Sequence, residues 1–308
     1  MTKTILITGS NGFIGSNLCS IIDEKYTNCN IVKVLKSNYN LTKESEVDNM
    51  FLDINPDVVI NLAGKVGGIL ANKEYPVEFF NDNALINIFM FKYAHKYNVE
   101  KMITFMGGCS YPSTAKSPIS EDEMWNGYPQ EESAAYSISK KMLLVMSKYY
   151  RKQYNFNSIV LIPGNVYGEF DNFDLNNSHV IPALIRKFYE AKIKKDNVTL
   201  WGSGDPIRDF VYIKDVVKTI PFFIDEYNSS EPVNISSGIG ISIKELSIKI
   251  KELVDFNGDL IWDTSKPNGQ MVKVFDVSRL NNLNLYCDTS MDEGLSNTIH
   301  WYKNNIEK

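Results

Sequence analysis

Cysteine, histidine and long hydrophobic runs are all scarce in this 308-residue sequence, and it lacks an excess of positive charge. It has 32 Lys and Arg against 37 Asp and Glu, for a formal net charge of −5, and the basic residues form no block. Neither a nucleic acid nor an anionic membrane surface is therefore expected as a partner. The longest apolar stretch without charge, residues 83–91, is far too short to span a bilayer. The first residues contain no hydrophobic signal segment, so we expect a cytoplasmic protein.

The few cysteines and histidines are scattered along the chain. No two cysteines have the CxxC spacing of zinc or redox motifs, and the histidines do not cluster. The sequence therefore predicts neither a disulfide scaffold nor a metal site. The residues concerned are Cys19, Cys29, Cys109, Cys287, His95, His179 and His300.

Short apolar segments alternate with longer amphipathic segments through the first half of the chain. We expect strands at residues 4–8, 31–35, 58–60, 102–106 and 158–162, and helices at residues 13–25, 43–52, 77–97 and 134–153. Nearly continuous apolar strands separated by helices are typical of a parallel sheet that is covered on both faces. The sequence therefore predicts an α/β protein with a doubly wound parallel sheet.

Beyond about residue 165 the alternation becomes irregular. Loops rich in Asn, Gly and Pro separate shorter helices, which we expect at residues 180–192, 214–226, 243–254 and 289–304. We assign residues 1–168 to a first domain and residues 169–308 to a smaller C-terminal α/β lobe that faces the substrate. Residues 209–213 and 232–235 can add a strand to either sheet, so segments between 209 and 235 can cross back to the first domain.

A glycine motif, GxxGxxG, lies between the first expected strand and the first expected helix. Its glycines permit a tight turn and a close approach of the backbone to a pyrophosphate, which the helix N-terminus attracts. Glycines also collect in ordinary turns, but this position between strand and helix favours a dinucleotide site of the Rossmann type. The expected cofactor-binding residues of the motif are Gly9, Asn11, Gly12, Phe13, Ile14 and Gly15.

The second expected strand ends without an acidic residue. NAD-dependent enzymes commonly place a carboxylate there, where it binds the adenosine ribose. Here the end of the strand carries Lys36 and Ser37, which can meet a ribose 2′-phosphate with a charge and a hydrogen bond. This favours NADPH over NADH, although a lysine at a strand end is often only a solvated side chain.

Tyr136 and Lys140 have the YxxxK spacing at the start of an expected helix. Residues four apart lie on one helix face, so the ammonium can lie near the phenol. A free tyrosine has a pKa of about 10, and we expect the ammonium and a cationic nicotinamide to lower it. Tyr136 can then exchange the proton that accompanies hydride transfer. An exposed Tyr–Lys pair is the alternative, but it does not explain the glycine motif upstream.

The two motifs together resemble those of the extended short-chain dehydrogenases/reductases. Further segments are similar to motifs of the GDP-L-fucose synthase family, and the resemblance runs from the N-terminus to the last helix. SHVIPAL, at residues 178–184, and WGSG, at residues 201–204, are far more specific than the glycine motif. The other matching segments are residues 61–69, 109–112, 171–173, 208–210 and 265–269.

The resemblance implies a two-part reaction on a GDP-linked 4-keto-6-deoxy sugar, with NADP(H) as cofactor and GDP-L-fucose as product. The residue matching Cys109 is the base of the 3,5-epimerisation, and the residue matching His179 is the partner acid. Tyr136 and Lys140 then serve the reduction of the C4 ketone. Without the resemblance, Cys109 reads as a small buried side chain and His179 as a structural histidine.

The family positions also imply which residues surround each ligand and how the chain assembles. Arginines can bind diphosphate oxygens with two hydrogen bonds, and lysine provides a mobile charge. The resemblance implies a homodimer, because family members usually dimerise through the YxxxK helix and the helix before it; a buried helix of a monomer would show the same apolar residues. Beside the glycine motif, the implied cofactor-binding residues are Leu62, Ala63 and Lys140. The implied substrate-binding residues are Asn165, Arg186, Trp201, Arg208 and Lys266.

One position departs from the family pattern. Family members have Ser or Thr where this chain has Gly107, and that hydroxyl bonds the C4 oxygen beside the catalytic tyrosine. Loss of one such donor can cost on the order of 10²–10³ in rate. Ser110, Ser137 or a water molecule can replace it, and the intact Tyr136 and Lys140 predict that reduction survives.

Three alternatives stay open at this point. The sugar can be another GDP-4-keto sugar, such as a colitose or 6-deoxy-heptose precursor. The glycine at position 107 also allows an epimerase with weak or no net reduction. A catalytically silent nucleotide sensor is the third alternative, although a sensor has no need of both Tyr136 and Lys140.

Overall fold

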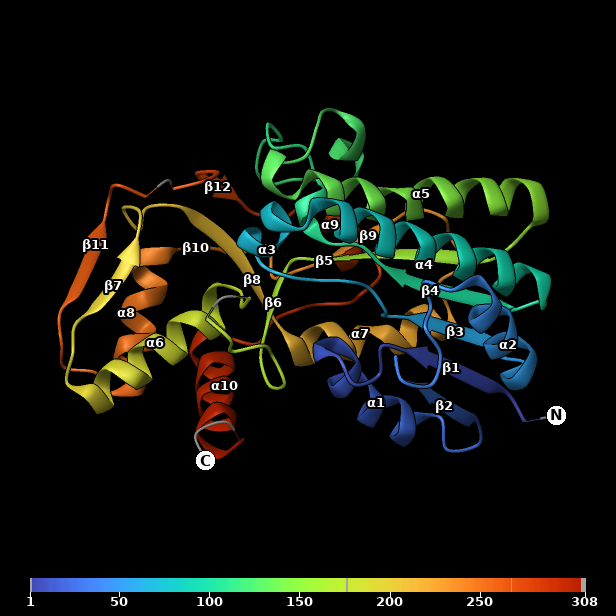
Figure 1. The fold of residues 1–308 in the computed structure, drawn as a ribbon, viewed down its shortest axis with the longest axis horizontal. Helices are drawn as coiled ribbons and strands as arrows, with labels where there is room; N and C mark the ends of the chain where they lie inside the picture. Colours follow the sequence, from blue (N-terminus) through green and yellow to red (C-terminus); the bar gives the residue numbers. More distant parts are fainter. Residues whose placement is uncertain (1, 176, 267, 306–308) are drawn as a thin grey trace.

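The structure, a computed structural model, describes residues 2–175, 177–266 and 268–305. Two parts lie side by side along the long axis of the molecule (Figure 1). One is a parallel sheet flanked by helices, near the N-terminus, and the other is a smaller lobe that contains the last helix. Among the described residues, no helix is long and apolar enough to cross a membrane.

In the described part of the chain, six parallel strands form the large sheet in the order β2-β1-β3-β4-β5-β9. The chain runs from β1 to one edge and then returns to the other side of β1, which makes a switch point between β1 and β3. Doubly wound sheets bind their ligands there, outside the carboxyl ends of the strands. The predicted fold class is confirmed. The strands are β1 (Thr4–Thr8), β2 (Asn30–Val34), β3 (Val58–Asn61), β4 (Lys101–Phe105), β5 (Ser158–Pro163) and β9 (Val233–Ile235).

Helices cover both faces of this sheet because the strands are apolar on both sides. Ile5 and Ile7 pack in one buried cluster with residues of α1 and α7, whereas Leu6 packs in a second cluster with residues of α2, α4 and α5. Side chains alternate across a strand, so neighbours enter opposite layers. The helices are α1 (Phe13–Lys25), α2 (Glu44–Ile54), α4 (Pro76–Lys96), α5 (Ala134–Tyr154) and α7 (Ile213–Asp225).

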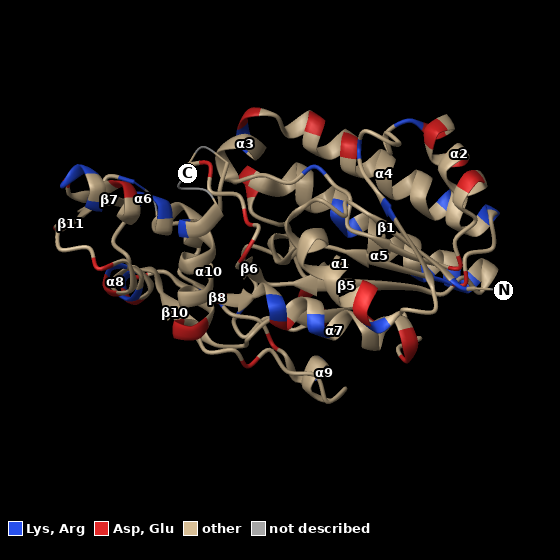
Figure 2. Cartoon of the chain, turned by 90° about the horizontal axis from the view of Figure 1, so that it is seen from below, with Lys and Arg blue, Asp and Glu red and all other residues tan. Residues whose placement is uncertain are grey.

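Charged residues of both signs lie along α2 and α4, as Figure 2 shows. Lys92 of α4 pairs with Glu44 of α2, and Lys96 pairs with Asp48. Exposed pairs of this kind contribute little to stability. They keep these helix surfaces free of a block of one charge.

The smaller lobe is built around β8 (Ile207–Tyr212). β10 (Gly240–Ser242) pairs with it antiparallel, while β6 (Asn165–Tyr167) and β12 (Val272–Lys273) pair with it in parallel. β7 (Val198–Trp201) and β11 (Leu260–Asp263) form a separate parallel pair. The helices of the lobe are α6 (Val180–Lys194), α8 (Ile243–Val254), α9 (Ser278–Asn281) and α10 (Met291–Asn305).

The segment between the lobe's strands returns to the large sheet. β8, at residues 207–212, stays in the lobe, whereas β9, at residues 233–235, forms the edge of the large sheet beside β5. α7 between them packs on α1. Several short elements were not predicted, because two to six residues show no periodicity. They include α3 (Ile69–Glu74) and the 3₁₀ turns η1 (Gly108–Ser110), η2 (Glu121–Trp125) and η3 (Glu131–Ser133).

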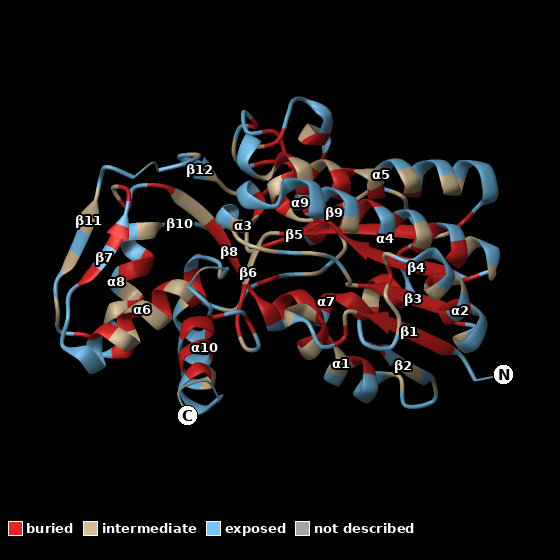
Figure 3. Ribbon diagram, viewed as in Figure 1, coloured by how far each residue is buried: buried red, intermediate tan, exposed pale blue. Residues whose placement is uncertain are grey.

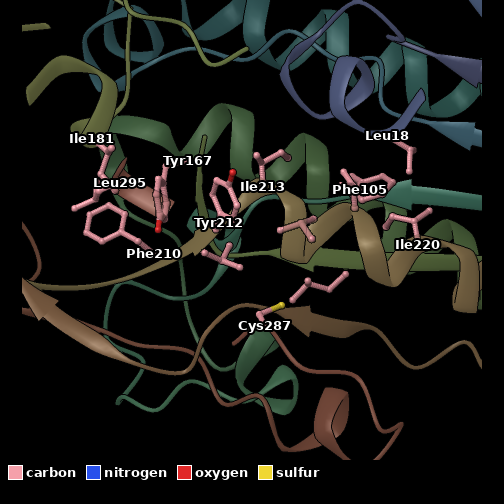
Figure 4. Packing of buried hydrophobic residues seen from close by; sticks show 14 of the residues in the cluster. Leu18, Phe105, Tyr167, Ile181, Phe210, Tyr212, Ile213, Ile220, Cys287 and Leu295 are labelled. Carbon is pink, nitrogen blue, oxygen red and sulfur yellow. The ribbon is translucent and has the colours of Figure 1, made fainter. Parts of the chain in front are cut away.

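One buried cluster runs through both parts of the molecule. Figure 3 shows the buried strands of the large sheet and buried segments of α6, α8 and α10 in the lobe. Leu18 and Ile220 of the large part belong to the same cluster as Tyr167 and Phe210 of the lobe (Figure 4). A shared core fixes the lobe relative to the sheet, because close-packed side chains resist displacement.

Candidate active site

The glycine motif forms a tight turn between β1 and α1. Gly9 has a φ of +66°, and a Cβ on it would lie only 2.9 Å from the amide nitrogen of Ala63. A Cβ on Gly15 would lie 2.2 Å from the carbonyl oxygen of Gly9. α1 begins after Gly12 without a side-chain cap, so its first amides are left for a ligand. These residues fit a pyrophosphate, since only glycine allows the turn and the free amides face an anion.

Neighbouring strand ends complete the surroundings of this turn. The backbone amides of Leu62 and Ala63 donate to the carbonyl and the hydroxyl of Thr8, both at 3.3 Å. Ser10 donates to the carbonyl of Val34 at 3.3 Å, which ties the turn to the end of β2. Lys36 is exposed just beyond that end. Its ammonium group can therefore contact a phosphate that lies beside the end of β2. Of the other predicted motif residues, Asn11 is exposed and Phe13 and Ile14 are half-buried.

Tyr136 and Lys140 lie in the first turns of α5 and face the loops that follow β3 and β4. A Cβ on Gly64 would lie 3.3 Å from the Lys140 Nζ and 2.8 Å from the Asn83 Oδ1. The ring of Phe79 packs edge-on against Tyr136, with the centroids 6.3 Å apart. The YxxxK pair is thus buried at the carboxyl edge of the sheet, where a doubly wound fold binds its ligands.

The expected effect of Lys140 on Tyr136 is wrong for the chain by itself. Burial raises the pKa of the Tyr136 phenol, and the neighbouring Cys109 raises it further. Burial also lowers the pKa of Lys140 to about 8. Desolvation penalises both charged forms, and this penalty exceeds the attraction that the spacing suggested. The phenol therefore stays protonated at neutral pH, although the same burial makes it a weaker acid.

Cys109 and Tyr136 meet at Gly107. A Cβ on Gly107 would lie 3.2 Å from the Cys109 Sγ and 3.6 Å from the Tyr136 hydroxyl. Cys109 lies in η1, directly after β4, and its carbonyl accepts a hydrogen bond of 3.2 Å from Ser137 of α5. The structure therefore brings the predicted thiol and phenol to one point, and the missing hydroxyl would lie at that point.

Two serines were candidates to replace that hydroxyl. Ser137 donates to the carbonyl of Cys109, so its proton is already used. Ser110 is fully buried, and its hydroxyl has no partner among the described residues. Ser137 therefore offers no free donor beside Gly107, whereas the Ser110 hydroxyl is free to donate but is buried.

His179 lies directly before α6, and its side chain makes no capping hydrogen bond there. It is the N-cap residue, it is exposed, and desolvation by its surroundings nevertheless lowers the pKa of its imidazole. A Cβ on Gly68 would lie 3.5 Å from the carbonyl oxygen of Ser178, the residue before it. The residue before His179 thus lies at the Gly68 end of the loop whose Gly64 end lies against Lys140.

Some of the predicted substrate-binding residues are available to a ligand, and others already bind protein groups. The Lys266 Nζ lies 5.7 Å from the centroid of the exposed Trp201 ring. Arg208 lies near the segment that follows, since a Cβ on Gly269 would lie 3.7 Å from its Nη2. Arg186 is already engaged, because it donates to Glu190 at 2.6 Å and to the carbonyl of Phe173 at 3.1 Å.

Asn165 uses its amide group to hold the lobe. Its Nδ2 donates to the carbonyl of Asp209 at 2.7 Å, across the pairing of β6 with β8. In the part of the chain that the structure describes, no group of three or more His, Cys, Asp and Glu could hold a metal ion. All four cysteines are free thiols.

Sequence reasoning missed three residues that shape the site. Asn83 of α4 is fully buried and clasps Lys65 through both of its amide atoms, which fixes the loop against Lys140. Phe79 packs on Tyr136, and Phe275 packs on Gly108. A polar residue on the apolar face of a predicted helix, as Asn83 is, was the one signal that could have been followed.

Comparisons with known proteins agree with this geometry. A sequence profile of the NAD dependent epimerase/dehydratase family matches residues 5–236. A putative GDP-L-fucose synthase 2 of Arabidopsis thaliana is 38% identical over 304 residues, covering 98% of this chain and 92% of the relative. The GDP-L-fucose synthase of Sinorhizobium fredii is 36% identical, with 99% and 96% covered.

Solved structures give the same relationship. A GDP-L-fucose synthetase from Naegleria fowleri bound to NADP has a TM-score of 0.91 at 27% identity, with 100% of this chain and 96% of that chain covered. A GDP-mannoheptose C4 reductase from Campylobacter jejuni with NADP bound has a TM-score of 0.87 at 26% identity, with 98% of each chain covered. The chain therefore belongs to the NAD dependent epimerase/dehydratase family and, within it, to the GDP-L-fucose synthases.

Proposed function

We propose that this protein catalyses the NADPH-dependent 3,5-epimerisation and 4-reduction of a GDP-4-keto-6-deoxy sugar, with GDP-L-fucose as the product. The observation that carries this proposal is the meeting of the Cys109 thiol and the Tyr136 phenol at Gly107. One group is suited to carbon acid chemistry and the other to proton donation at a carbonyl oxygen. The named activity of the relatives supports the same reaction.

Epimerisation needs a base and an acid on opposite faces of the sugar. The Cys109 thiolate takes the proton from a carbon beside the C4 ketone, and the electron pair moves onto the ketone oxygen to give an enolate. His179, in its protonated form, returns a proton to that carbon on the other face, although desolvation lowers the pKa of its imidazole and so reduces the protonated fraction at neutral pH. The thiol and the neutral imidazole then exchange protons with water, which restores both groups for the second carbon.

Reduction uses the YxxxK pair. NADPH, when bound, supplies the hydride that C4 accepts. Tyr136 donates its proton to the C4 oxygen as negative charge develops there, and burial keeps the phenol protonated until that point. Lys140, whose Nζ lies near Gly64, supports the position of Tyr136 and binds the cofactor. The glycine turn holds the pyrophosphate, Leu62 and Ala63 border the cofactor, and Lys36 meets the ribose 2′-phosphate.

The two parts of the chain divide the ligands between them. Residues 1–168, joined by the returning segment of α7 and β9, bind NADP(H), and the remainder of residues 169–308 binds the nucleotide-sugar. Trp201, Arg208 and Lys266 gather on the lobe, where they can stack on guanine and pair with diphosphate. Arg186 joins them once it leaves Glu190, and Asn165 offers its amide oxygen.

The direct test supplies the full-length protein with NADPH and GDP-4-keto-6-deoxymannose. NADPH absorbance reports reduction, and NMR of the product reports the configuration at C3, C4 and C5. We expect GDP-L-fucose and one NADPH oxidised for each sugar formed. Failure to turn over any GDP-linked keto sugar would reject the proposal.

A second candidate keeps the chemistry and changes the sugar. The likeness to a GDP-mannoheptose C4 reductase favours it, as does Gly107, which leaves more room beside the ketone than a serine would. A colitose precursor is a further option of this kind. Parallel assays with GDP-4-keto-heptose and GDP-4-keto-6-deoxymannose distinguish them by the ratio of kcat/KM.

An epimerase with little net reduction is a third candidate, prompted by the absence of a donor at Gly107. Deuterium from solvent would then enter C3 or C5 without oxidation of NADPH. A nucleotide sensor of the same fold would show neither exchange nor oxidation. One experiment in deuterated water therefore separates the epimerase/reductase, the epimerase and the sensor.

The proposal extends to assembly and location. Apolar side chains are exposed along the paired helices α4 and α5, including Val77, Ile88, Val145 and Tyr149, and they fit a four-helix interface in a homodimer. Sedimentation tests this: a monomer at micromolar concentration would contradict it.

Four free thiols fit the reducing cytoplasm, where we place the enzyme.

A further inference from the structure

We propose that Phe79 is a positioning residue for the reduction: its ring fixes the place of the Tyr136 phenol relative to the C4 ketone and the cofactor. Phe79 contacts neither ligand in this account, because it acts through Tyr136. Its role in reduction rests on the proposed function, whereas its contact with the phenol does not. The inference rests on how α4 and the loop after β3 hold this ring against α5.

Phe79 and Tyr136 lie near the starts of the neighbouring helices α4 and α5 (Figure 1). Their ring centroids are 6.3 Å apart, and the ring planes meet at 83°. Aromatic pairs favour this edge-on arrangement at centroid separations of about 4.5–7 Å, where the positive edge of one ring meets the negative face of the other. Both side chains are buried. The contact therefore restricts the plane of the phenol directly.

The loop after β3 holds the Phe79 ring from another side. The Lys65 Nζ lies 5.6 Å from the centroid of this ring, within the range of a cation–π interaction, and 3.4 Å from the Asp82 carboxylate. A Cβ on Gly67 would lie only 2.9 Å from the Phe79 Cζ, so the tip of the ring rests against the loop. The ring thus has little freedom to move away from Tyr136.

Hydrogen bonds fix α4 to the turn of α5 that carries the phenol. Asn87, about two turns beyond Phe79 on α4, is buried, and its Nδ2 donates to the Ser139 carbonyl at 2.8 Å. The Ser139 hydroxyl in turn donates to the Tyr136 carbonyl at 2.7 Å. The two helices therefore keep one register at this point, and the ring of Phe79 meets the phenol at a constant distance.

Gly107 makes the phenol more dependent on this ring. A Cβ on Gly107 would lie 3.6 Å from both the Cε1 and the hydroxyl oxygen of Tyr136, so a side chain at that position would pack on the phenol. Glycine supplies none, and the orientation of Tyr136 then depends more on Phe79. Misplacement of a catalytic group by about 1 Å can cost on the order of 10² in rate. The alternative, that Phe79 only fills the core, is decided by the experiments below.

The first measurement separates reduction from epimerisation in the full-length protein, with NADPH and GDP-4-keto-6-deoxymannose in deuterated water. Phe79→Leu should lower kcat for NADPH oxidation by about 10- to 100-fold, because the proton donor is misplaced. The KM values and the deuterium exchange at C3 and C5 should stay within about twofold of the wild type, since the contact serves only the transition state of reduction. A merely structural role would lower exchange and reduction together.

Gly67→Ala tests the same contact without changing Phe79. Its Cβ would meet the Phe79 Cζ at 2.9 Å, so the ring must shift and reduction should weaken as in Phe79→Leu. Gly68→Ala is the matched control, because its nearest neighbour would lie at 3.5 Å. Phe91→Leu is the control for α4: it removes an edge-on contact with Tyr150, with centroids 5.3 Å apart, about three turns further along the helix. Both controls should reduce the sugar at the wild-type rate.

The second measurement needs no sugar. 3-Fluorotyrosine placed at position 136 gives one ¹⁹F resonance, whose position reports the packing around the phenol. Phe79→Leu and Gly67→Ala should both shift this resonance, whereas Gly68→Ala and Phe91→Leu should leave it in place. The resonance thus reports the contact between Phe79 and Tyr136 whether or not the protein turns over a nucleotide-sugar.

An unchanged resonance in folded Phe79→Leu overturns the proposal, as does NADPH oxidation by this variant at the wild-type rate. Equal losses of deuterium exchange and reduction also overturn it. Should Phe79→Leu fail to fold, Phe79→Met gives the same comparison. A shifted resonance in a protein that turns over no GDP-linked keto sugar would reject the proposed function alone.

Discussion

The ring of Phe275 closes directly over Gly108, and a Cβ on Gly108 would lie 2.5 Å from the Cζ of that ring. Phe275 itself is buried, and its backbone amide donates a hydrogen bond to the Asp209 carboxylate of the lobe. The turn that carries Cys109 is therefore held by a side chain from the other part of the molecule. Room for this contact exists only because position 108 has no side chain.

Gly108→Ala should destabilise the protein and displace the thiol. Overpacking in a tight core costs about 1–3 kcal/mol, so we expect the free energy of unfolding in urea to fall by that amount. Epimerisation should fall with it. Gly68→Ala is the matched control, since its Cβ would meet its nearest neighbour at 3.5 Å, an ordinary contact. Phe275→Leu should relieve the clash, and a double variant no more stable than Gly108→Ala would contradict this explanation.

Gly107→Ser should strengthen reduction. Gly107 has an extended backbone, with φ −93° and ψ 147°, which serine adopts without strain. The new Cβ would lie 3.2 Å from the Cys109 Sγ, so the thiol must shift by a few tenths of an ångström. The added hydroxyl can bond the C4 oxygen, and such a donor is worth at most on the order of 10²–10³ in kcat.

Gly107→Ala is the matched control for this gain. It adds the same Cβ without the hydroxyl, so reduction should stay the same or fall. Equal kcat values for the serine and alanine variants, measured by NADPH oxidation, would show that the missing donor does not limit the reaction.

The burial of Lys140 predicts a stability that depends on pH. Its pKa is lowered to about 8 in the folded protein, from 10.5 when the chain is unfolded. Between these values the unfolded state binds more protons, so the free energy of unfolding rises as pH rises through this window. Compared with Lys140→Met, the wild type should gain on the order of 2–3 kcal/mol from about pH 8 to 10.5. A difference between the two proteins that stays flat across this range, in urea titrations, would mean that Lys140 is not desolvated.

The large sheet was predictable because its strands are unbroken apolar segments with helices between them. Ile5, Leu6 and Ile7, for example, are all fully buried, as a strand covered on both faces requires. The glycine turn and the YxxxK pair were predictable because each depends on spacing within one element. Helix ends agreed to within two residues for the same reason.

The contacts within the site were not predictable, because they join segments that are distant in the sequence. No local pattern links Phe275 to Gly108 or Phe79 to Tyr136. The expected direction of the pKa shift of Tyr136 was wrong for a related reason. Spacing reveals the neighbouring ammonium, but it does not reveal how completely the fold excludes water from the phenol.

The central claim is that the Cys109 thiol serves epimerisation and the Tyr136 phenol serves reduction. Tyr136→Phe in deuterated water tests it most directly. With GDP-4-keto-6-deoxymannose and NADPH, this variant should incorporate deuterium at C3 and C5 at close to the wild-type rate. Its NADPH oxidation should fall by about 10²–10⁴, since its proton donor is gone. Oxidation of NADPH by Tyr136→Phe at the wild-type rate, or loss of deuterium exchange together with reduction, would contradict the account.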